Sequence, residues 1–241
     1  MERLRSVDGW ATRALRLLLP PRCLLCGSAG TAGRDLCAGC ASDFVPNAMC
    51  CPRCALPLSV PAPLCGECLA RDPPFGRAWV PFVYAHPLDL LETRFKFGAD
   101  LAAGRVLADG MVDRAVADRP ERPEALVPVP LHAARLRERG YNQALELARP
   151  LATAFGIPLR ADLLRRLRAT PPQTGLDAKT RRRNLRGAFA VAVDAVPPDH
   201  VALVDDVMTT GATLRECARM LRRAGVTRVD VWALARAPAK R

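Results

Sequence analysis

The stretch at residues 201–213, VALVDDVMTTGAT, constrains this chain of 241 residues more than any other. It begins with four apolar, partly β-branched residues, which favour a strand buried on both faces. Two acids, Asp205 and Asp206, follow at the carboxyl end of that strand. A small, hydroxyl-rich loop centred on Gly211 comes next, and apolar residues then recur at helical spacing. The pattern predicts a strand, an acid pair, a loop and a helix in that order.

This order of elements suits a ligand that carries a phosphate beside a diol, such as a ribose 5-phosphate. A helix N-terminus presents unpaired N–H groups and partial positive charge, which bind phosphate. Small loop residues allow the backbone to come close, and hydroxyl groups add hydrogen bonds. The carboxylates would repel a phosphate, but they accept hydrogen bonds from a diol or act through Mg²⁺. The candidate phosphate-binding residues are Thr209, Thr210, Gly211, Ala212 and Thr213.

All 13 residues resemble the signature of type I phosphoribosyltransferases. The resemblance implies that Asp205 and Asp206 hold the ribose hydroxyl groups of phosphoribosyl pyrophosphate, and that the loop holds its 5-phosphate. Purine-salvage enzymes of this class carry an aspartate base at the first loop position, where this chain has Thr209. The resemblance therefore points away from those enzymes, and no residue is identified as the catalytic base. The alternative interpretation is a buried strand and helix joined by a polar turn.

A cysteine repeat is the second strong feature. Nine of the ten cysteines lie in residues 23–68, where four Cys-x-x-Cys pairs form two sets offset by 28 residues, with Cys50 outside the repeat. Each pair aims two thiolates at one metal ion, and two pairs complete a tetrahedral zinc shell. The predicted ligands are Cys23, Cys26, Cys37, Cys40, Cys51, Cys54, Cys65 and Cys68.

Disulfides and iron–sulfur clusters are the two alternatives to zinc at these cysteines. Disulfides require an oxidising compartment, and nothing in the sequence indicates export. Iron–sulfur clusters also take four cysteines. We expect two structural Zn²⁺ ions, which would supply folding energy to a module with little apolar content. Pairing of neighbouring Cys-x-x-Cys units gives two independent ribbons, while a crossed pairing of residues 23 and 26 with residues 51 and 54 stays open.

The remaining pattern predicts an α/β domain. Strands are expected at residues 79–85, 125–130, 163–167, 189–193 and 229–234, and helices at residues 88–97, 101–116 and 141–155. This alternation favours a mostly parallel, Rossmann-like sheet with helices on both faces and a ligand beyond the carboxyl ends of the strands. We expect a double zinc ribbon at residues 21–72 and the phosphoribosyltransferase-like domain at residues 75–241.

Three basic segments are candidates for contacts with phosphate or pyrophosphate. Lys96 lies between the first two helices of the α/β domain, and Arg135 and Arg139 follow the strand at residues 125–130. Arg181 belongs to a polar, proline-broken, basic segment at residues 168–186, whose composition predicts a mobile loop. The resemblance to type I phosphoribosyltransferases implies that this loop closes over the diphosphate. The alternative for each of these side chains is a solvated position on the surface.

Composition limits the partners. The formal net charge of +12 favours phosphate-bearing partners, including nucleic acid, although an arginine-rich solvated surface explains it equally well. No run approaches the roughly 20 apolar residues that span a bilayer, so we expect no transmembrane segment. Residues 1–20 predict an amphipathic helix that packs on the domain, with a membrane surface as the alternative.

The order of the motifs extends the resemblance to nearly the whole chain. The cysteine repeat, VPVPLHAARLRERGYNQ, PPQTGLDAKTRRRNLRGAF and VALVDDVMTTGAT follow one another as in the ComF family, also called ComFC or GntX-like proteins. The resemblance implies a cytoplasmic protein that binds phosphoribosyl pyrophosphate with Mg²⁺ and handles incoming single-stranded DNA beside proteins of the competence machinery. The alternatives are a phosphoribosyltransferase of nucleotide metabolism with no DNA role, and a non-catalytic sensor or regulator. No motif identifies the acceptor or the oligomeric state.

Overall fold

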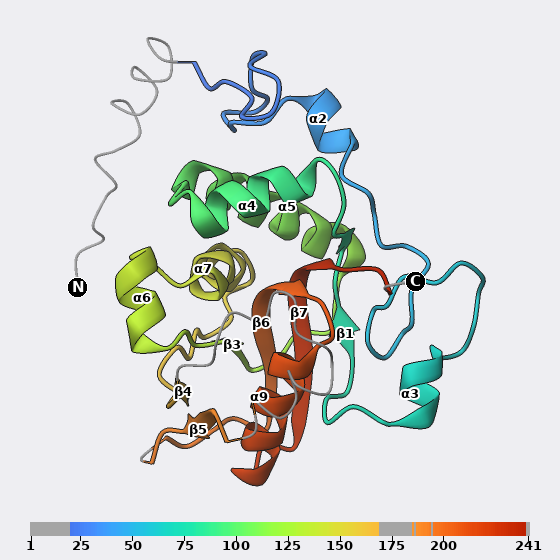
Figure 1. Ribbon diagram of the computed structural model, residues 1–241, viewed down its shortest axis with the longest axis vertical. Helices are drawn as coiled ribbons and strands as arrows, with labels where there is room; N and C mark the ends of the chain where they lie inside the picture. Colours follow the sequence, from blue (N-terminus) through green and yellow to red (C-terminus); the bar gives the residue numbers. More distant parts are fainter. Residues whose placement is uncertain (1–19, 169–184, 186, 194, 240–241) are drawn as a thin grey trace.

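A parallel sheet in the order β1-β7-β6-β3 forms the centre of the computed structural model (Figure 1). The structure describes residues 20–168, 185, 187–193 and 195–239. Residues 1–19 of the helix predicted for residues 1–20, and Arg181, therefore lie outside the described residues. β6 (His200–Met208) and β7 (Arg228–Arg236) are the long central strands, flanked by β3 (Ala125–Pro128) and β1 (Ala78–Trp79). The predicted mostly parallel α/β sheet is confirmed.

The central strands are apolar because both of their faces are covered. Along β6, Val201 and Leu203 pack into one hydrophobic cluster, while Ala202 and Val204 pack into the other. All four side chains are fully buried. Alternate residues of a strand point to opposite faces, so the continuous apolar run follows directly from a sheet with layers on both sides.

Helices supply those two layers. α4 (Leu88–Phe97), α5 (Leu101–Asp118) and α7 (Gln143–Phe155) pack in the cluster on one face of the sheet, and α9 (Ala212–Arg223) packs on the other (Figure 1). Asn142 caps α7, because its side chain accepts a hydrogen bond from the Ala144 N–H. A separate antiparallel pair is formed by β4 (Leu164–Arg166) and β5 (Phe189–Val191).

Three elements differ from the expected ranges. The strand expected at residues 79–85 is split into β1 and β2 (Phe82–Val83), both paired with the outer side of β7, because Pro81 offers no N–H to a ladder. β6 continues to Met208 while pairing with β7, so Asp205 and Asp206 lie within its last part rather than after it. The basic segment after β3, which carries Arg135 and Arg139, contains α6 (Ala133–Arg139), where no helix was expected.

The two cysteine modules pack against different parts of this domain (Figure 1). The first carries α2 (Ala38–Ser42), and its Arg34 pairs with Asp113 of α5. The second carries α3 (Gly66–Ala70), and its four cysteines share a hydrophobic cluster with the α9 face of the sheet. The domain limits expected from the sequence stay a prediction. Within the described part of the chain, every helix is too short or too polar to cross a membrane.

The packing of α4 on α5 gives a testable prediction. A Cβ atom at Gly104 would lie 2.4 Å from a ring carbon of the buried Phe95, whereas a Cβ atom at Gly110 meets nothing closer than 3.9 Å. Overpacking costs about 1–3 kcal/mol, so Gly104→Ala should lower the free energy of unfolding. Gly110→Ala, the control on the same helix, should raise it by about 1 kcal/mol through helix propensity. Denaturant titration measures both, and equal effects would contradict this packing.

Candidate functional site

The eight predicted cysteine ligands form two tetrads. The first contains Cys23, Cys26, Cys37 and Cys40, and the second contains Cys51, Cys54, Cys65 and Cys68. Within each tetrad all ligand atoms lie within 4.8 Å of one another. Neighbouring Cys-x-x-Cys units therefore pair, and the crossed arrangement that the sequence left open does not occur.

The sulfur distances fit zinc. The Sγ atoms of Cys26 and Cys37 lie 3.7 Å apart, and those of Cys54 and Cys65 lie 3.5 Å apart. Zinc–sulfur bonds of about 2.3 Å in a tetrahedron place the sulfur atoms about 3.8 Å apart. A disulfide requires about 2.0 Å, and all of these cysteines are free thiols. The tetrads fit two structural zinc sites.

Backbone donors favour the thiolate at equivalent positions of the two repeats. Burial opposes ionisation of Cys23, but the N–H groups of Cys37, Cys26 and Leu25 outweigh it and lower its pKa to about 6. Cys51 stands at the same repeat position, and backbone N–H groups lower its pKa to about 7 despite burial. Zinc binds the thiolate form, so these donors prepare both knuckles for the metal.

The acid pair lies where the central strand β6 reaches the carboxyl edge of the sheet. One carboxylate oxygen of Asp206 lies 3.0 Å from Nζ of Lys96, and the other accepts a 2.6 Å hydrogen bond from the Val207 N–H. A carboxylate oxygen of Asp205 accepts a 3.0 Å hydrogen bond from the Asp206 N–H. Lys96 comes from α4, which brings a cation to the acids from the neighbouring layer.

Lys96 also belongs to a second ion pair on α4. Its Nζ lies 2.9 Å from Oε1 of the buried Glu92, one helical turn earlier, and the Tyr84 hydroxyl donates to Glu92 Oε2 at 3.1 Å. Although burial opposes it, the carboxylates of Asp206 and Glu92 raise the pKa of Lys96. The lysine stays charged and lies at the carboxylates. The proposed contact of Lys96 with phosphate or substrate stays a prediction.

The two adjacent acids have opposite protonation tendencies. Burial raises the pKa of Asp205 to about 8, and the negative charge of Asp206 acts in the same direction. Burial also disfavours the charged form of Asp206, but Lys96 and the Val207 N–H hold its pKa below the ordinary value. Near neutral pH the pair therefore carries one negative charge and one proton, and a divalent cation would displace that proton.

The loop after β6 has the geometry of an anion cradle. Gly211 is the N-cap residue of α9 and has a left-handed φ of 67°. No side chain caps this helix, so its first N–H groups point outward for a ligand. Ala212 is buried, and its N–H lies 3.4 Å from the Thr210 hydroxyl. Thr209 and Thr213 complete the predicted loop.

Basic side chains approach the acids from two further elements. Arg139, at the end of α6, has its guanidinium 5.6 Å from the centre of the Phe97 ring. Burial lowers the pKa of Arg139, and the negative charge of Asp206 opposes that shift. Burial lowers the pKa of Arg166 of β4, the charge of Arg135 on α6 acts in the same direction, and Asp205 opposes them. Sequence reasoning missed Arg166, and it also missed Glu92, for which the four-residue spacing to Lys96 on one helix was a usable signal.

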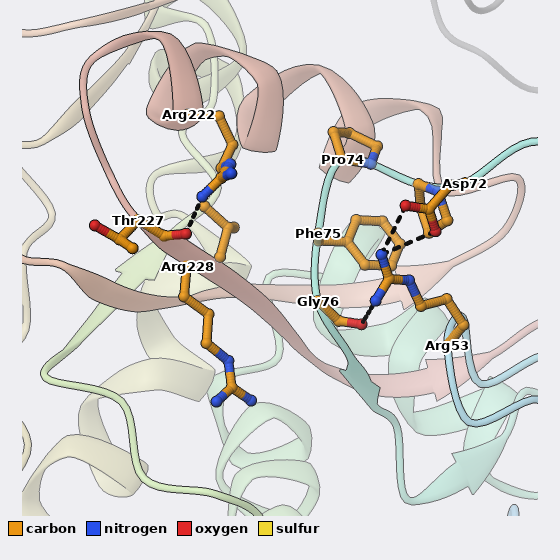
Figure 2. Close-up of a pocket in the computed structure, with 10 residues that line it drawn as sticks. Arg53, Asp72, Pro74, Phe75, Gly76, Arg222, Thr227 and Arg228 are labelled. Atoms are coloured by element: carbon orange, nitrogen blue, oxygen red, sulfur yellow. Dashed lines mark hydrogen bonds and ion pairs between the residues drawn. The ribbon is translucent and has the colours of Figure 1, made fainter.

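A cavity of about 280 Å³ lies elsewhere, between the second cysteine module and α9 (Figure 2). Arg53 donates to the Gly76 carbonyl at 2.7 Å and pairs with Asp72, and Arg222 donates to backbone carbonyls at residues 226 and 227. The protein's own oxygen atoms already bind these guanidinium groups, so this cavity is a weaker candidate for an anion than the loop after β6.

Comparisons with known proteins agree with this architecture. A model of the double zinc ribbon domain matches residues 14–69, and a model of the phosphoribosyl transferase domain matches residues 142–241. The chain thus combines a double zinc ribbon with a phosphoribosyltransferase domain. A solved glutamine phosphoribosylpyrophosphate amidotransferase from B. subtilis aligns with 54% of this chain and 26% of its own, with 22% identity and a TM-score of 0.37.

Full-length relatives identify the family. Competence protein F of Haemophilus influenzae is 39% identical over 223 residues, which cover 90% of this chain and 97% of that protein. DNA utilization protein YhgH of Escherichia coli (strain K12) is 34% identical over 91% of this chain and 99% of its own. Competence protein ComFC of Bacillus subtilis is 31% identical over 73% and 72% of the two chains. The chain belongs to the ComF family.

The raised pKa of Asp205 gives a prediction about stability and pH. Its folded-state pKa of about 8 lies above the unfolded value of about 3.9, so its proton stabilises the fold fully below pH ~4. This contribution is lost as the pH rises toward about 8. Asp205→Asn carries no titrating group, so its melting temperature relative to the parent should increase steadily between pH ~5 and ~8.5.

The matched control is Asp162→Asn. Asp162 is exposed, and its hydrogen bonds with Arg160 hold its pKa below the ordinary value. A lowered pKa has the opposite sign, so this variant should gain nothing as the pH rises. A parent protein that gains stability over Asp205→Asn across the same range would show that Asp205 is ionised in the fold.

Proposed function

We propose that this protein binds phosphoribosyl pyrophosphate with Mg²⁺ at the end of β6 and acts in the handling of incoming DNA. One observation carries the ligand assignment: two adjacent carboxylates, the partly buried Asp205 and the buried Asp206, lead directly into an uncapped helix N-terminus whose Gly211 is left-handed. The carboxylates suit a diol or a divalent cation, and the N–H groups suit a phosphate. A ribose 5-phosphate carries both a diol and a phosphate.

Each side of the proposed ligand has its own residues. Asp205 and Asp206 would accept hydrogen bonds from the ribose hydroxyl groups, and Lys96 would keep Asp206 ionised. The amide and hydroxyl groups of residues 209–213 would hold the 5-phosphate. Arg135 and Arg139 lie on α6 and are proposed to hold the pyrophosphate together with Arg181.

This arrangement supports departure of pyrophosphate from the ribose. Bound Mg²⁺ would supply positive charge against the developing negative charge of the leaving group. Arg135 and Arg139 would add fixed charge at the same place, which is where electrostatic stabilisation accelerates a reaction most. Glu92 already accepts hydrogen bonds from Lys96 and Tyr84, so it is not available as a base. Transfer to an acceptor and simple ligand sensing share this site, and a pyrophosphate-release assay separates them.

The DNA role is proposed from the relatives and from charge. The relatives' names, Competence protein F and DNA utilization protein YhgH, associate those proteins with uptake and use of DNA. A net charge of +12 suits a partner with a phosphate backbone. We therefore propose a cytoplasmic protein that contacts single-stranded DNA and works beside proteins of the competence machinery. If the protein does not bind DNA, phosphoribosyl transfer in nucleotide metabolism becomes the favoured function.

Calorimetric titration tests the ligand assignment. Asp205→Asn together with Asp206→Asn should weaken binding of phosphoribosyl pyrophosphate and Mg²⁺ by about one to two powers of ten per charge-assisted hydrogen bond lost. Gly211→Val should weaken ribose 5-phosphate as well, because an added Cβ would meet Met208 at 2.7 Å and the backbone is left-handed. Asp162→Asn, an exposed carboxylate far along the chain, should bind as the parent does. A folded double variant with parental affinity would contradict the assignment.

Salt dependence tests the DNA assignment. Binding of single-stranded DNA should weaken with salt by a slope of about −0.7 per phosphate neutralised, in log affinity against log salt concentration. Changing Arg181, Arg182 and Arg183 together to Ala should flatten that slope. Arg160→Ala is the control, because Asp162 already engages that guanidinium. An unchanged slope in the triple variant would show that the arginine run is only a solvated segment.

A further inference from the structure

Arg236 is a buried arginine that joins the second cysteine tetrad to the loop at residues 209–213, called the phosphate loop below. It is the last residue of β7, and only 3% of it is exposed. Its Nε donates to the backbone carbonyl of Cys54 at 3.1 Å. Its Nη1 donates to the carbonyl of Met208 at 2.8 Å and also to the carbonyl of Thr209. One planar group therefore bonds to a metal-ligating residue and to the first residues of the loop.

The carbonyls bound by Arg236 lie where the chain enters the phosphate loop and where the second cysteine tetrad is formed. Met208 ends β6 and Thr209 begins the loop, so their carbonyl positions set the direction in which the chain enters residues 209–213. The Cys54 carbonyl belongs to a knuckle whose shape depends on the sulfur atoms being drawn to one metal ion. A guanidinium offers donors in a fixed fork, which transmits the position of one backbone segment to the other more rigidly than an ammonium group does.

A second arginine repeats the connection on the other side of the loop. Arg215, on α9, is 5% exposed, and its Nη2 donates to Oε1 of Glu67 at 3.1 Å. Glu67 lies in α3, between two cysteines of the second tetrad. The backbone N–H of Arg215 donates to the Gly211 carbonyl at 2.9 Å. The Arg215 guanidinium lies 5.9 Å from the centre of the Phe75 ring.

The first tetrad has different neighbours. Arg34 of its module pairs with Asp109 and Asp113 on α5, and Arg94 of α4 donates to the Leu24 carbonyl at 2.7 Å. In the described chain, these contacts end at the outer helices and do not reach the phosphate loop. The molecule thus contains an internal control: two similar tetrads, of which the second is connected to the loop through Arg236 and Arg215.

We propose that the metal-loaded second tetrad positions the phosphate loop through Arg236 and Arg215, so that loss of this metal loosens the loop and weakens the phosphosugar ligand. The effect on the ligand rests on the function proposed above. The effect on the loop does not, because the order of the loop is measurable without any ligand. Arg236 and Arg215 are positioning residues in this account, since they act through the backbone and the helix.

Hydrogen–deuterium exchange on the full chain tests the proposal directly. The paired changes are Cys65→Ser with Cys68→Ser in the second tetrad, and Cys37→Ser with Cys40→Ser in the first. Elemental analysis should show one zinc ion lost in each. Loop exchange is measured at the backbone amides of Ala237 and Arg215, which donate to the carbonyls of Met208 and Gly211. These amides should exchange about tenfold faster in the second-tetrad variant, the factor for loss of one such hydrogen bond. They should exchange at the parental rate in the first-tetrad variant.

Arg236→Lys gives an independent measurement with both metals in place. It keeps the charge but loses the fork, so loop exchange should rise while zinc content stays parental. Arg228→Lys, at the other end of β7 and paired with Glu121 and Asp230, is the control. The Arg236→Lys measurement decides the question even if the cysteine variants do not fold. Parental loop exchange in folded Arg236→Lys would overturn the proposal.

Calorimetry on the same samples separates this proposal from the assigned function. With phosphoribosyl pyrophosphate and Mg²⁺ as the probe, the second-tetrad and Arg236→Lys variants should bind about tenfold more weakly than the parent. A parent that does not bind this probe would refute the assigned function while leaving the exchange result to decide the coupling. Faster loop exchange with parental affinity would refute the claim that the tetrad governs the ligand.

Discussion

The ion pair between Lys96 and Asp206 is the interaction on which the site depends. A central strand that ends in two adjacent carboxylates, the partly buried Asp205 and the buried Asp206, is costly, because each charge loses water and repels the other. Nζ of Lys96 lies 3.0 Å from a carboxylate oxygen of Asp206 and allows that carboxyl to stay ionised. Burial raises the pKa of Asp205 to about 8, so Asp205 keeps its proton below that pH. α4 supplies this cation, and Glu92 on the same helix pairs with the same lysine.

The motif and the cysteine spacing could be predicted because their geometry is local. A buried strand, a small loop and a helix follow one another within residues 201–213, and each Cys-x-x-Cys unit forms its knuckle from neighbouring residues. Even here the limits of β6 differed, since its pairing with β7 carries the strand past both acids. The crossed and uncrossed pairings satisfied the same repeat, and only the packing of the modules decided between them.

The support around the site could not be predicted, because it joins residues far apart in the chain. Arg236 bonds to Cys54 across 182 positions, and Arg215 bonds to Glu67 across 148. No spacing rule marks such pairs, and an arginine at the end of an apolar strand looks like a solvated terminus. The sequence suggested a ribbon followed by a separate domain, whereas the four cysteines of the second tetrad share a hydrophobic cluster with the sheet.

A crystal structure of the zinc-loaded protein with phosphoribosyl pyrophosphate and Mg²⁺ tests the central claim most directly. The account predicts the 5-phosphate against the amides of residues 209–213, the ribose hydroxyl groups at Asp205 and Asp206, and the pyrophosphate on the side of Arg139. A sugar phosphate bound instead in the cavity beside Arg53 and Phe75, with the loop after β6 empty, would contradict it.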